Sequence, residues 1–221
     1  MSGPRRLAGV DIGTLTCRLL IAEWQPGQPL KELRGERRIL RLGEGVDGTG
    51  RLGAAAMDRV IACLGEWRAL VDRYEVHATA AVATSAVRDA RNRAEFLDRV
   101  KGEAGSEVEI ISGGEEARRT LLGIRSGLPE DIANVLALDI GGGSTEFMLD
   151  RRGAPPLVRS IDIGVVRLCE RVFRHDPPSR DEIRQARQWV AGETNAVVSD
   201  MGGHASAAFV GTAGTVTSLA A

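Results

Sequence analysis

The chain contains 221 residues, of which 43% are hydrophobic and 27% are charged, and these are ordinary proportions for a soluble globular protein. The formal net charge is −1, so no overall field draws the chain to a polyanion, and we expect neither DNA nor a membrane among its partners. No apolar stretch is long enough for a membrane helix, no signal peptide is visible, and the three cysteines lack metal-ligand spacing. We therefore expect a cytoplasmic protein.

The first half of the sequence predicts three strands, followed by helices that alternate with strands. Apolar runs place the three strands at residues 7–12, 17–23 and 31–42. A Gly-rich loop follows, and apolar residues at helical spacing from 54 to 74 predict a helix with one buried face.

Two further strand–helix pairs complete this half. Residues 76–83 predict a strand, and Asn92 is expected to cap the next helix, with Glu95 at the capping-box position. A strand at 108–111 leads into a helix that begins near Glu115. The predicted order of the first half is βββαβαβα.

The second half restarts the same pattern. Strands are expected at 135–140, 145–149 and 157–163, then a helix from about 165, a helix opened by a capping box at 179–182, a strand at 207–210 and a last helix. The tripeptide Asp-Ile-Gly ends the first strand of both halves, at Asp11 and at Asp139, which are 128 residues apart. We interpret this pattern as an internal repeat.

The repeat predicts two α/β domains, residues 1–127 and 128–221. The second copy stops before the strand and the helix that close the first copy, so we expect the second domain to be incomplete at its C-terminus. An open apolar sheet edge is then expected beside residues 207–210, and such edges recruit other chains. The sequence therefore predicts a homo-oligomer, most simply a dimer, or a second domain that is less stable than the first.

The two Asp-Ile-Gly hairpins have the composition of phosphate-binding loops. Glycine, serine and threonine allow several backbone N–H groups to turn toward one point, where an anion can bind. An aspartate just before each turn can hold Mg²⁺ through water or orient a nucleophile. A single Asp-Ile-Gly is more often an ordinary turn, but two copies between apolar strands favour a site for adjacent phosphates.

Seven segments carry a more specific signal, and they follow one another in order along nearly the whole chain. They are VDIGT (10–14), RLGEGVD (41–47), ATSAVRDA (83–90), ISGGEEAR (111–118), LDIGGGSTE (138–146), IGVVRL (163–168) and GTAGT (211–215). Together they resemble the exopolyphosphatase and guanosine pentaphosphate phosphatase (Ppx/GppA) family, within the superfamily of actin, the sugar kinases and the heat-shock ATPases. The resemblance implies a fold of two duplicated ribonuclease H-like (actin-like ATPase) domains.

The resemblance also implies catalytic roles. Glu116 matches the catalytic base, which activates a water for attack on the terminal phosphorus. Asp139 matches an aspartate that binds Mg²⁺ and orients the water, and Glu146 matches an acidic residue near the same metal. Arg88 matches a basic residue that reaches into the cleft.

Two phosphate-binding loops are implied as well. The first consists of Asp11, Gly13, Thr14 and Thr16. The second consists of Gly141, Gly142, Gly143, Ser144 and Thr145.

Structural alternatives stand beside these roles. The helix dipole alone favours acidic residues at the start of a helix, and we assign that role to Glu115. Arg88 could instead pair with Asp89 or cap a turn. Two positions depart from the family pattern, since Leu15 stands where many members have Asn, and Ala213 replaces a usual Gly.

The sequence thus predicts a hydrolase that cleaves terminal phosphoanhydride bonds of inorganic polyphosphate, of guanosine pentaphosphate or of both, with Mg²⁺ as cofactor and a water activated by Glu116. Two alternatives stay open at this point. One is a module that binds these phosphates without turnover, and the other is an ATP-dependent kinase or ATPase of the same superfamily. The kinase would need an adenosine site in the second domain.

Overall fold

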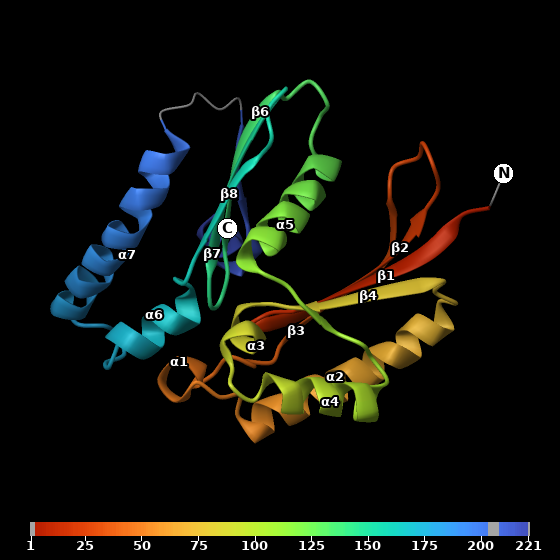
Figure 1. Ribbon diagram of the computed structural model, residues 1–221, viewed down its shortest axis with the longest axis horizontal. Coiled ribbons are helices and arrows are strands. Elements are labelled where there is room, and N and C mark those ends of the chain that lie inside the picture. Colours follow the sequence, from red (N-terminus) through yellow and green to blue (C-terminus); the bar gives the residue numbers. More distant parts are fainter. Residues whose placement is uncertain (1–2, 203–207, 221) are drawn as a thin grey trace. The chain divides into compact units, whose positions relative to one another are not determined.

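The computed structural model describes residues 3–202 and 208–220. The chain divides into two compact units, Met1–Ile111 and Ser112–Ala221, and each unit has its own β-sheet (Figure 1). The division lies upstream of the boundary expected after residue 127. The reason is that helix α5 (Gly113–Gly127) packs on the strands of the second unit.

The first unit contains a five-stranded sheet in the order β3-β2-β1-β4-β5. Its strands are β1 (Arg5–Ile12), β2 (Thr16–Trp24), β3 (Lys31–Ile39), β4 (Ala78–Ala83) and β5 (Glu109–Ile110). Strands β1, β2 and β3 pair antiparallel, while β4 runs parallel to both β1 and β5. The five strands follow one another along the chain as predicted, although β3 ends at Ile39 and does not reach residue 42.

Helices α2 (Ala54–Arg73) and α4 (Arg93–Ala104) cover one face of this sheet (Figure 1). Alternate residues of β1 and β2 point toward these helices, where Trp67 and Phe96 are among the largest fully buried side chains. Two short helices that the sequence did not predict lie in the connections, α1 (Val46–Thr49) and α3 (Ser85–Asp89).

The capping box predicted for Asn92 is wrong. Asn92 stands at the N-cap of α4, but its side chain makes no cap hydrogen bond. Its Oδ1 accepts from Leu52 N at 2.8 Å, and its Nδ2 donates to Leu52 O at 3.1 Å. The N–H and C=O groups of a buried residue such as Leu52 both need hydrogen-bond partners, and the side-chain amide of Asn92 bonds to both.

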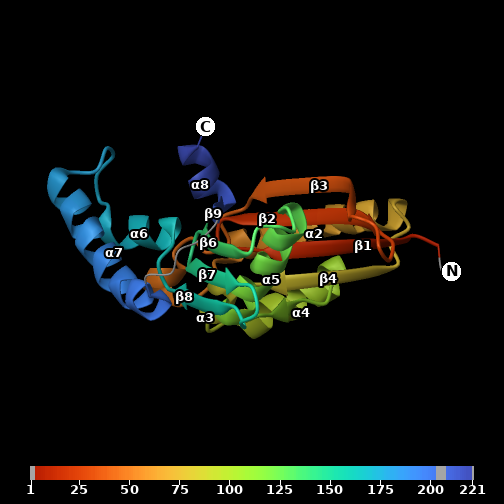
Figure 2. The same ribbon diagram turned by 90° about the horizontal axis from the view of Figure 1, so that it is seen from above.

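The second unit contains a four-stranded sheet in the order β8-β7-β6-β9. Its strands are β6 (Asn134–Ile140), β7 (Thr145–Arg151), β8 (Leu157–Ile161) and β9 (Ala208–Thr212), and Figure 2 shows β9 beside β6. Position 207 of the predicted last strand lies outside the described residues. The order repeats that of β3-β2-β1-β4 in the first unit, with the same parallel and antiparallel pairings, so the predicted internal repeat is present in the fold.

Helices cover both faces of the second sheet. Helix α5 packs on one face, against a core that includes Ala117, Ala137 and Met148, and α7 (Arg180–Met201) packs on the other, near Leu149 (Figure 1). Two shorter helices, α6 (Val165–Val172) and α8 (Ala213–Leu219), follow β8 and β9. In the part of the chain that the structure describes, no helix combines the length and the apolar character needed to span a membrane.

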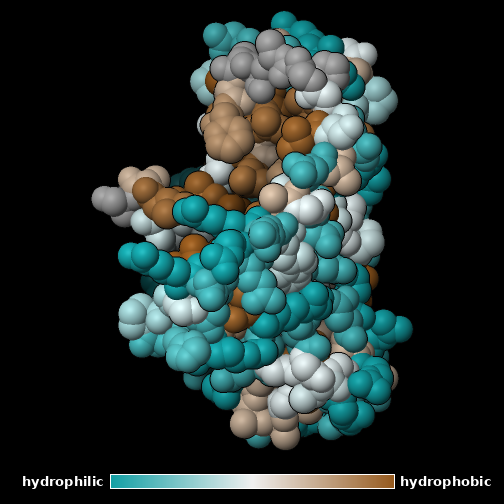
Figure 3. Space-filling view, turned by 90° about the vertical axis from the view of Figure 1, so that its left-hand side faces the viewer, coloured by the Kyte–Doolittle hydropathy of each residue, from teal (hydrophilic) through white to brown (hydrophobic). Residues whose placement is uncertain are grey.

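The α7 face of this sheet is partly open. An apolar cavity of about 170 Å³ lies between α7 and the strands, and Figure 3 shows hydrophobic residues gathered in a hollow there. Val198 and Phe209 on its border are 63% and 68% exposed. Apolar surface is therefore exposed on this face of the sheet, and association into a homo-oligomer stays a prediction.

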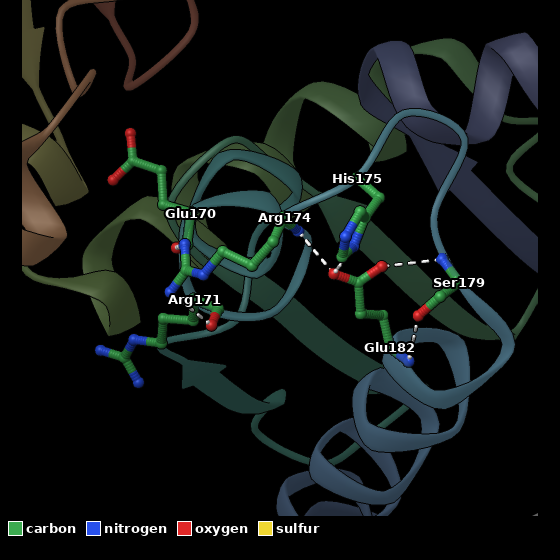
Figure 4. A network of polar contacts seen from close by, with 6 residues as sticks. All are labelled: Glu170, Arg171, Arg174, His175, Ser179 and Glu182. Atoms are coloured by element: carbon green, nitrogen blue, oxygen red, sulfur yellow. Dashed lines mark hydrogen bonds and ion pairs between the residues drawn. The ribbon is translucent and has the colours of Figure 1, made fainter.

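A buried carboxylate joins α6 to α7 (Figure 4). Ser179 caps α7 in the predicted capping box with Glu182. The carboxylate of Glu182 accepts from the backbone N–H groups of Ser179 and Arg174, both at 2.7 Å, and lies 3.0 Å from Nδ1 of His175. These donors, with the Ser179 N–H contributing most, lower the pKa of Glu182 from 4.5 to about 2.

The stability that Glu182 contributes should depend on pH. A carboxyl whose pKa falls on folding stabilises the protein above its unfolded pKa and loses that contribution as it protonates in the folded state. We expect Glu182→Gln to be less stable than the original protein at neutral pH, and the difference should shrink between pH 4.5 and about pH 2. Urea unfolding of both proteins across this range checks it, and a difference that does not change with pH would contradict it.

Candidate active site

Four polar residues form one row across the second sheet. Asp139 at the end of β6 lies opposite Glu146 of β7 and, on its other side, opposite Thr212 of β9, while Glu146 lies opposite Ser160 of β8. Directly paired residues share a face of a sheet, so all four point to the side that α5 covers. The next row on that face is apolar and belongs to the core, and it consists of Val158, Met148, Ala137 and Val210.

Helix α5 brings Glu116 to this row. Arg125 near the end of α5 forms an ion pair with Asp150 of β7, which fixes how far the helix lies along the strand. Nine residues of helix separate Glu116 from Arg125, about 14 Å, and four residues of strand separate Glu146 from Asp150, about 13 Å. Glu116 therefore lies at the end of the sheet where Asp139 and Glu146 lie.

The two glutamates that begin α5 have different surroundings. Glu115 forms ion pairs with Arg119 at 2.7 Å and with Arg118 at 3.8 Å on its own helix, and its N–H donates to the Ser112 side chain. These contacts suit the structural role expected of Glu115. Glu116 is half-buried, and its N–H donates to Ser112 O at 2.9 Å.

Two carboxylates face one another in the row. Glu146 is 2% exposed and accepts a hydrogen bond from Ser160 Oγ at 2.7 Å. Like charges directly opposite on a sheet repel, so the pair of Asp139 and Glu146 favours a cation nearby. Among the residues that the structure describes, no group of three or more His, Cys, Asp or Glu forms a metal cage. A two-carboxylate site fits Mg²⁺, which commonly binds through one or two carboxylates and the phosphates of a substrate.

The two hairpin loops close with the same hydrogen bond. Gly13 N donates to Thr16 O at 3.0 Å, and Gly141 N donates to Ser144 O at 3.0 Å. A Cβ on Gly13 would lie 2.9 Å from Thr16 O, and one on Gly141 would lie 3.1 Å from Ser144 O. A side chain at Gly13 would therefore force the loop to shift, and one at Gly141 would make a tight contact with the backbone of its loop.

The start of α6 donates hydrogen bonds to backbone carbonyls of the second loop, residues 141–144. Val165 N donates to Gly141 O at 3.1 Å, and Val166 N donates to Gly142 O at 2.9 Å. In a planar trans peptide the N–H of the next residue points opposite to the carbonyl. The N–H groups of Gly142 and Gly143 thus point away from α6, which is the arrangement of an anion-binding nest.

The first loop is held in the same way by the segment after β3. Gly43 N donates to Thr14 O at 2.8 Å, and Leu40 N and Arg41 N donate to Leu15 O at 2.9 and 3.0 Å. These bonds turn the chain away from the sheet, so β3 ends earlier than predicted. A Cβ on Gly43 would meet the methyl of Thr14 at 2.2 Å.

The threonines predicted to bind phosphate differ in their hydroxyl contacts. Thr14 is 8% exposed, and its buried Oγ1 has no hydrogen-bond partner within the described part of the chain. Thr145 Oγ1 donates to Ile163 O at 2.6 Å, so its proton holds the segment before α6. Thr16 and Ser144 accept the closing bonds of their loops through their carbonyls.

The remaining predicted residues lie in the first unit. Asp11 is the residue before the last one of β1, where it is opposite Arg18 of β2. Arg88 of α3 donates from Nη1 to Ile111 O at 3.1 Å, and its Nε lies 3.9 Å from Oδ1 of Asp89. The pairing with Asp89 that stood as the structural alternative for Arg88 is therefore present. Its catalytic role stays a prediction.

Sequence reasoning missed Ser160 and Thr212. Ser160 belongs to none of the quoted segments, and Thr212 lies in the GTAGT segment, to which the sequence assigned no role in the site. Both join the row through the pairing of β8 with β7 and of β9 with β6. The departure noted at Ala213 has a structural meaning, because its φ is +64°, a left-handed conformation that favours glycine.

Comparison with known proteins identifies the family. The model of the Ppx/GppA phosphatase family matches residues 20–221. The chain belongs to this family. Exopolyphosphatase 2 of Mycobacterium tuberculosis is 38% identical over 98% of this chain and 70% of its own length.

Solved structures of Ppx/GppA proteins share the fold. The Aquifex aeolicus member is 36% identical, with a TM-score of 0.77 over 99% of this chain and 69% of that chain. An exopolyphosphatase from Cytophaga hutchinsonii is 30% identical, with a TM-score of 0.90 over 98% of this chain and 69% of that chain. These findings confirm the predicted family and its actin-like α/β fold, and they make the chain a phosphohydrolase by family.

The Ppx/GppA chain should not tolerate a side chain at Gly164. A Cβ there would lie 2.4 Å from the carbonyl carbon and oxygen of Gly142 and 2.5 Å from Gly143 N, all of which are backbone atoms of the second loop. We expect Gly164→Ala to displace the loop and lower phosphatase turnover by roughly 10²-fold, the cost of a misplacement of about 1 Å.

Gly192→Ala in α7 is the matched control, since nothing lies within 4 Å of a Cβ at that position. It should keep full turnover and raise thermal stability, because alanine is the better helix former. Phosphate release and thermal unfolding of both variants test the difference. Normal turnover in Gly164→Ala would refute the proposed tight contact.

Proposed function

We propose that this chain hydrolyses the terminal phosphoanhydride bond of inorganic polyphosphate, with Glu116 as the general base. The main support for the proposal is the pair of facing carboxylates, Asp139 and Glu146. The pair lies beside the second loop, at the end of the sheet where Glu116 also lies. The substrate is supported by relatives named exopolyphosphatase, among them the proteins of Mycobacterium tuberculosis and Mycobacterium leprae. Guanosine pentaphosphate is the second substrate that the family name admits.

The second loop supplies positioning in this mechanism. Backbone N–H groups that already point toward the anion need no reorganisation when charge develops on the phosphate oxygens. Such donors hold the terminal phosphate in line with the attacking water. Ser144 and the three glycines before it provide this binding.

Glu116 and Asp139 act on the water. The water oxygen forms a bond to the terminal phosphorus, the bond from phosphorus to the bridging oxygen breaks, and the proton of the water passes to Glu116. The carboxylate of Asp139 orients the water. Mg²⁺ bound near Asp139 and Glu146 would offset the negative charge of the phosphates when it is present.

One experiment separates this proposal from its rivals. Phosphate release is measured from polyphosphate, from guanosine pentaphosphate and from ATP, each with and without Mg²⁺. Release from polyphosphate supports the proposal, and release only from guanosine pentaphosphate changes the substrate. Binding of either compound without release indicates a binding module, and turnover of ATP alone indicates an ATPase.

Replacement of the base should separate binding from chemistry. We expect Glu116→Gln to bind polyphosphate normally and to lose turnover by roughly 10²–10⁴-fold, because an amide cannot accept the proton. Glu115→Gln is the control, and it should change turnover little, since Glu115 pairs with arginines of its own helix. Equal losses in the two variants, or no loss in Glu116→Gln, would exclude Glu116 as the base.

Replacement of Asp139 tests the cation. Asparagine has the same volume but carries no charge, so Asp139→Asn should abolish Mg²⁺-dependent turnover and leave thermal unfolding unchanged. Mg²⁺ titration of turnover and a melting curve provide the two readouts. If the variant unfolds at a clearly lower temperature, Asp139 is a structural turn residue and the assignment is wrong.

A further inference from the structure

The second loop contains three consecutive glycines, Gly141 to Gly143, and it needs an external constraint to keep one conformation. Glycine populates more backbone conformations than any other residue, so a run of three loses more entropy when it is ordered. The first loop has Thr14 and Leu15 at the positions of Gly142 and Gly143. Their side chains restrict that backbone, and the second loop lacks this restriction.

Arg167 supplies a constraint that has no side-chain counterpart among the described residues of the first unit. Its Nε donates to Gly143 O at 3.0 Å. At the equivalent position of the first unit, Leu15 O accepts from two backbone N–H groups, those of Leu40 and Arg41. In the second unit one guanidinium takes the place of that backbone segment.

The contact has a defined consequence for the donors of the loop. Because the peptide is planar and trans, holding Gly143 O toward α6 turns the N–H of Ser144 the other way. Val165 N and Val166 N fix the two preceding carbonyls in the same sense. Arg167 thus extends the aligned set from the N–H groups of Gly142 and Gly143 to that of Ser144.

We infer that Arg167 is a positioning residue, which presets the Ser144 N–H, and with it the second loop, for a phosphate before the phosphate arrives. The inference rests on the proposed function, because it assigns the loop to phosphate. Arginine suits the task, since its guanidinium stays charged at every physiological pH and offers planar donors. A carbonyl held by a charged donor is held more firmly than one held by a neutral donor.

The test compares three variants of the chain. Arg167→Met keeps the apolar stem and removes the donor, Arg167→Lys keeps a charged donor, and Arg174→Met is the control on the same connection. The guanidinium of Arg174 donates to the carbonyls of Glu170 and Arg171, within α6 itself. Each variant is measured for kcat and KM with polyphosphate, for thermal unfolding, and for the shift of the Ser144 amide NMR signal on titration with inorganic tripolyphosphate.

We expect Arg167→Met to raise KM and lower kcat, with a combined loss of roughly 10- to 100-fold in kcat/KM, as a misaligned loop would cause. Its Ser144 signal should respond weakly to tripolyphosphate, and its melting temperature should stay near that of the original protein. Arg167→Lys should recover part of both losses. Arg174→Met should keep normal kinetics and a normal Ser144 response.

Three outcomes overturn the inference. The first is an unchanged Ser144 response and unchanged kinetics in Arg167→Met, and the second is the same loss in Arg174→Met. The third is a loss of kcat/KM in both Arg167→Met and Arg167→Lys that is accompanied by a lower melting temperature. That result would mean that the Arg167 contact is purely structural. If the original protein releases no phosphate from polyphosphate, the proposed substrate fails. The positioning role then still stands when tripolyphosphate shifts Ser144 in the original protein and not in Arg167→Met.

Discussion

The hydrogen bonds that hold the loop carbonyls back are the constraint on which the rest of this structure depends. A hairpin loop binds an anion only if several N–H groups point to one side, and in planar peptides this requires that the carbonyls be held on the other. The first unit meets the requirement with the segment after β3, and the second with the start of α6. The contact of Gly164 with Gly142 follows from the second solution, because α6 must approach the loop closely enough to donate. The buried carboxylate of Glu182 then fixes the end of α6 to α7 (Figure 4).

Duplication produced two sheets of the same order but with different chemistry at the same position. Asp11 lies opposite Arg18, whereas Asp139 lies opposite Glu146. Opposite charges that face one another across two strands attract, while two facing carboxylates repel and favour a cation. This difference places the proposed cation site, and with it the proposed hydrolytic chemistry, in the second unit. The first unit retains a loop of the same geometry, which suits it for binding phosphate.

The position of the proposed base depends on a contact far from it. Glu116 stands in the first turn of α5, and the pairing of Arg125 with Asp150 at the other end determines where that turn lies. Arg125 also donates to the carbonyls of Ile132 and Ala133, so the end of α5 is bound to the segment that enters β6. Since α5 packs on the second sheet, Glu116 belongs to the same compact unit as Asp139 and Glu146.

The sequence by itself determined the family, the repeat, most strands and helices, and the positions of the two Asp-Ile-Gly loops. These features are local, because an apolar period, an Asp-Ile-Gly tripeptide and the capping box at Ser179 each depend only on residues that are close together in the sequence. The tertiary structure alone decided which residues share the row with Asp139, since Ser160 and Thr212 meet it through the pairing of strands that are distant in the chain. It also showed that the side chain of Asn92 forms hydrogen bonds with the backbone of Leu52 and does not cap its own helix, and that Arg167 donates to Gly143 O. Contacts between segments distant in the chain depend on register and packing, and no local pattern records either of them.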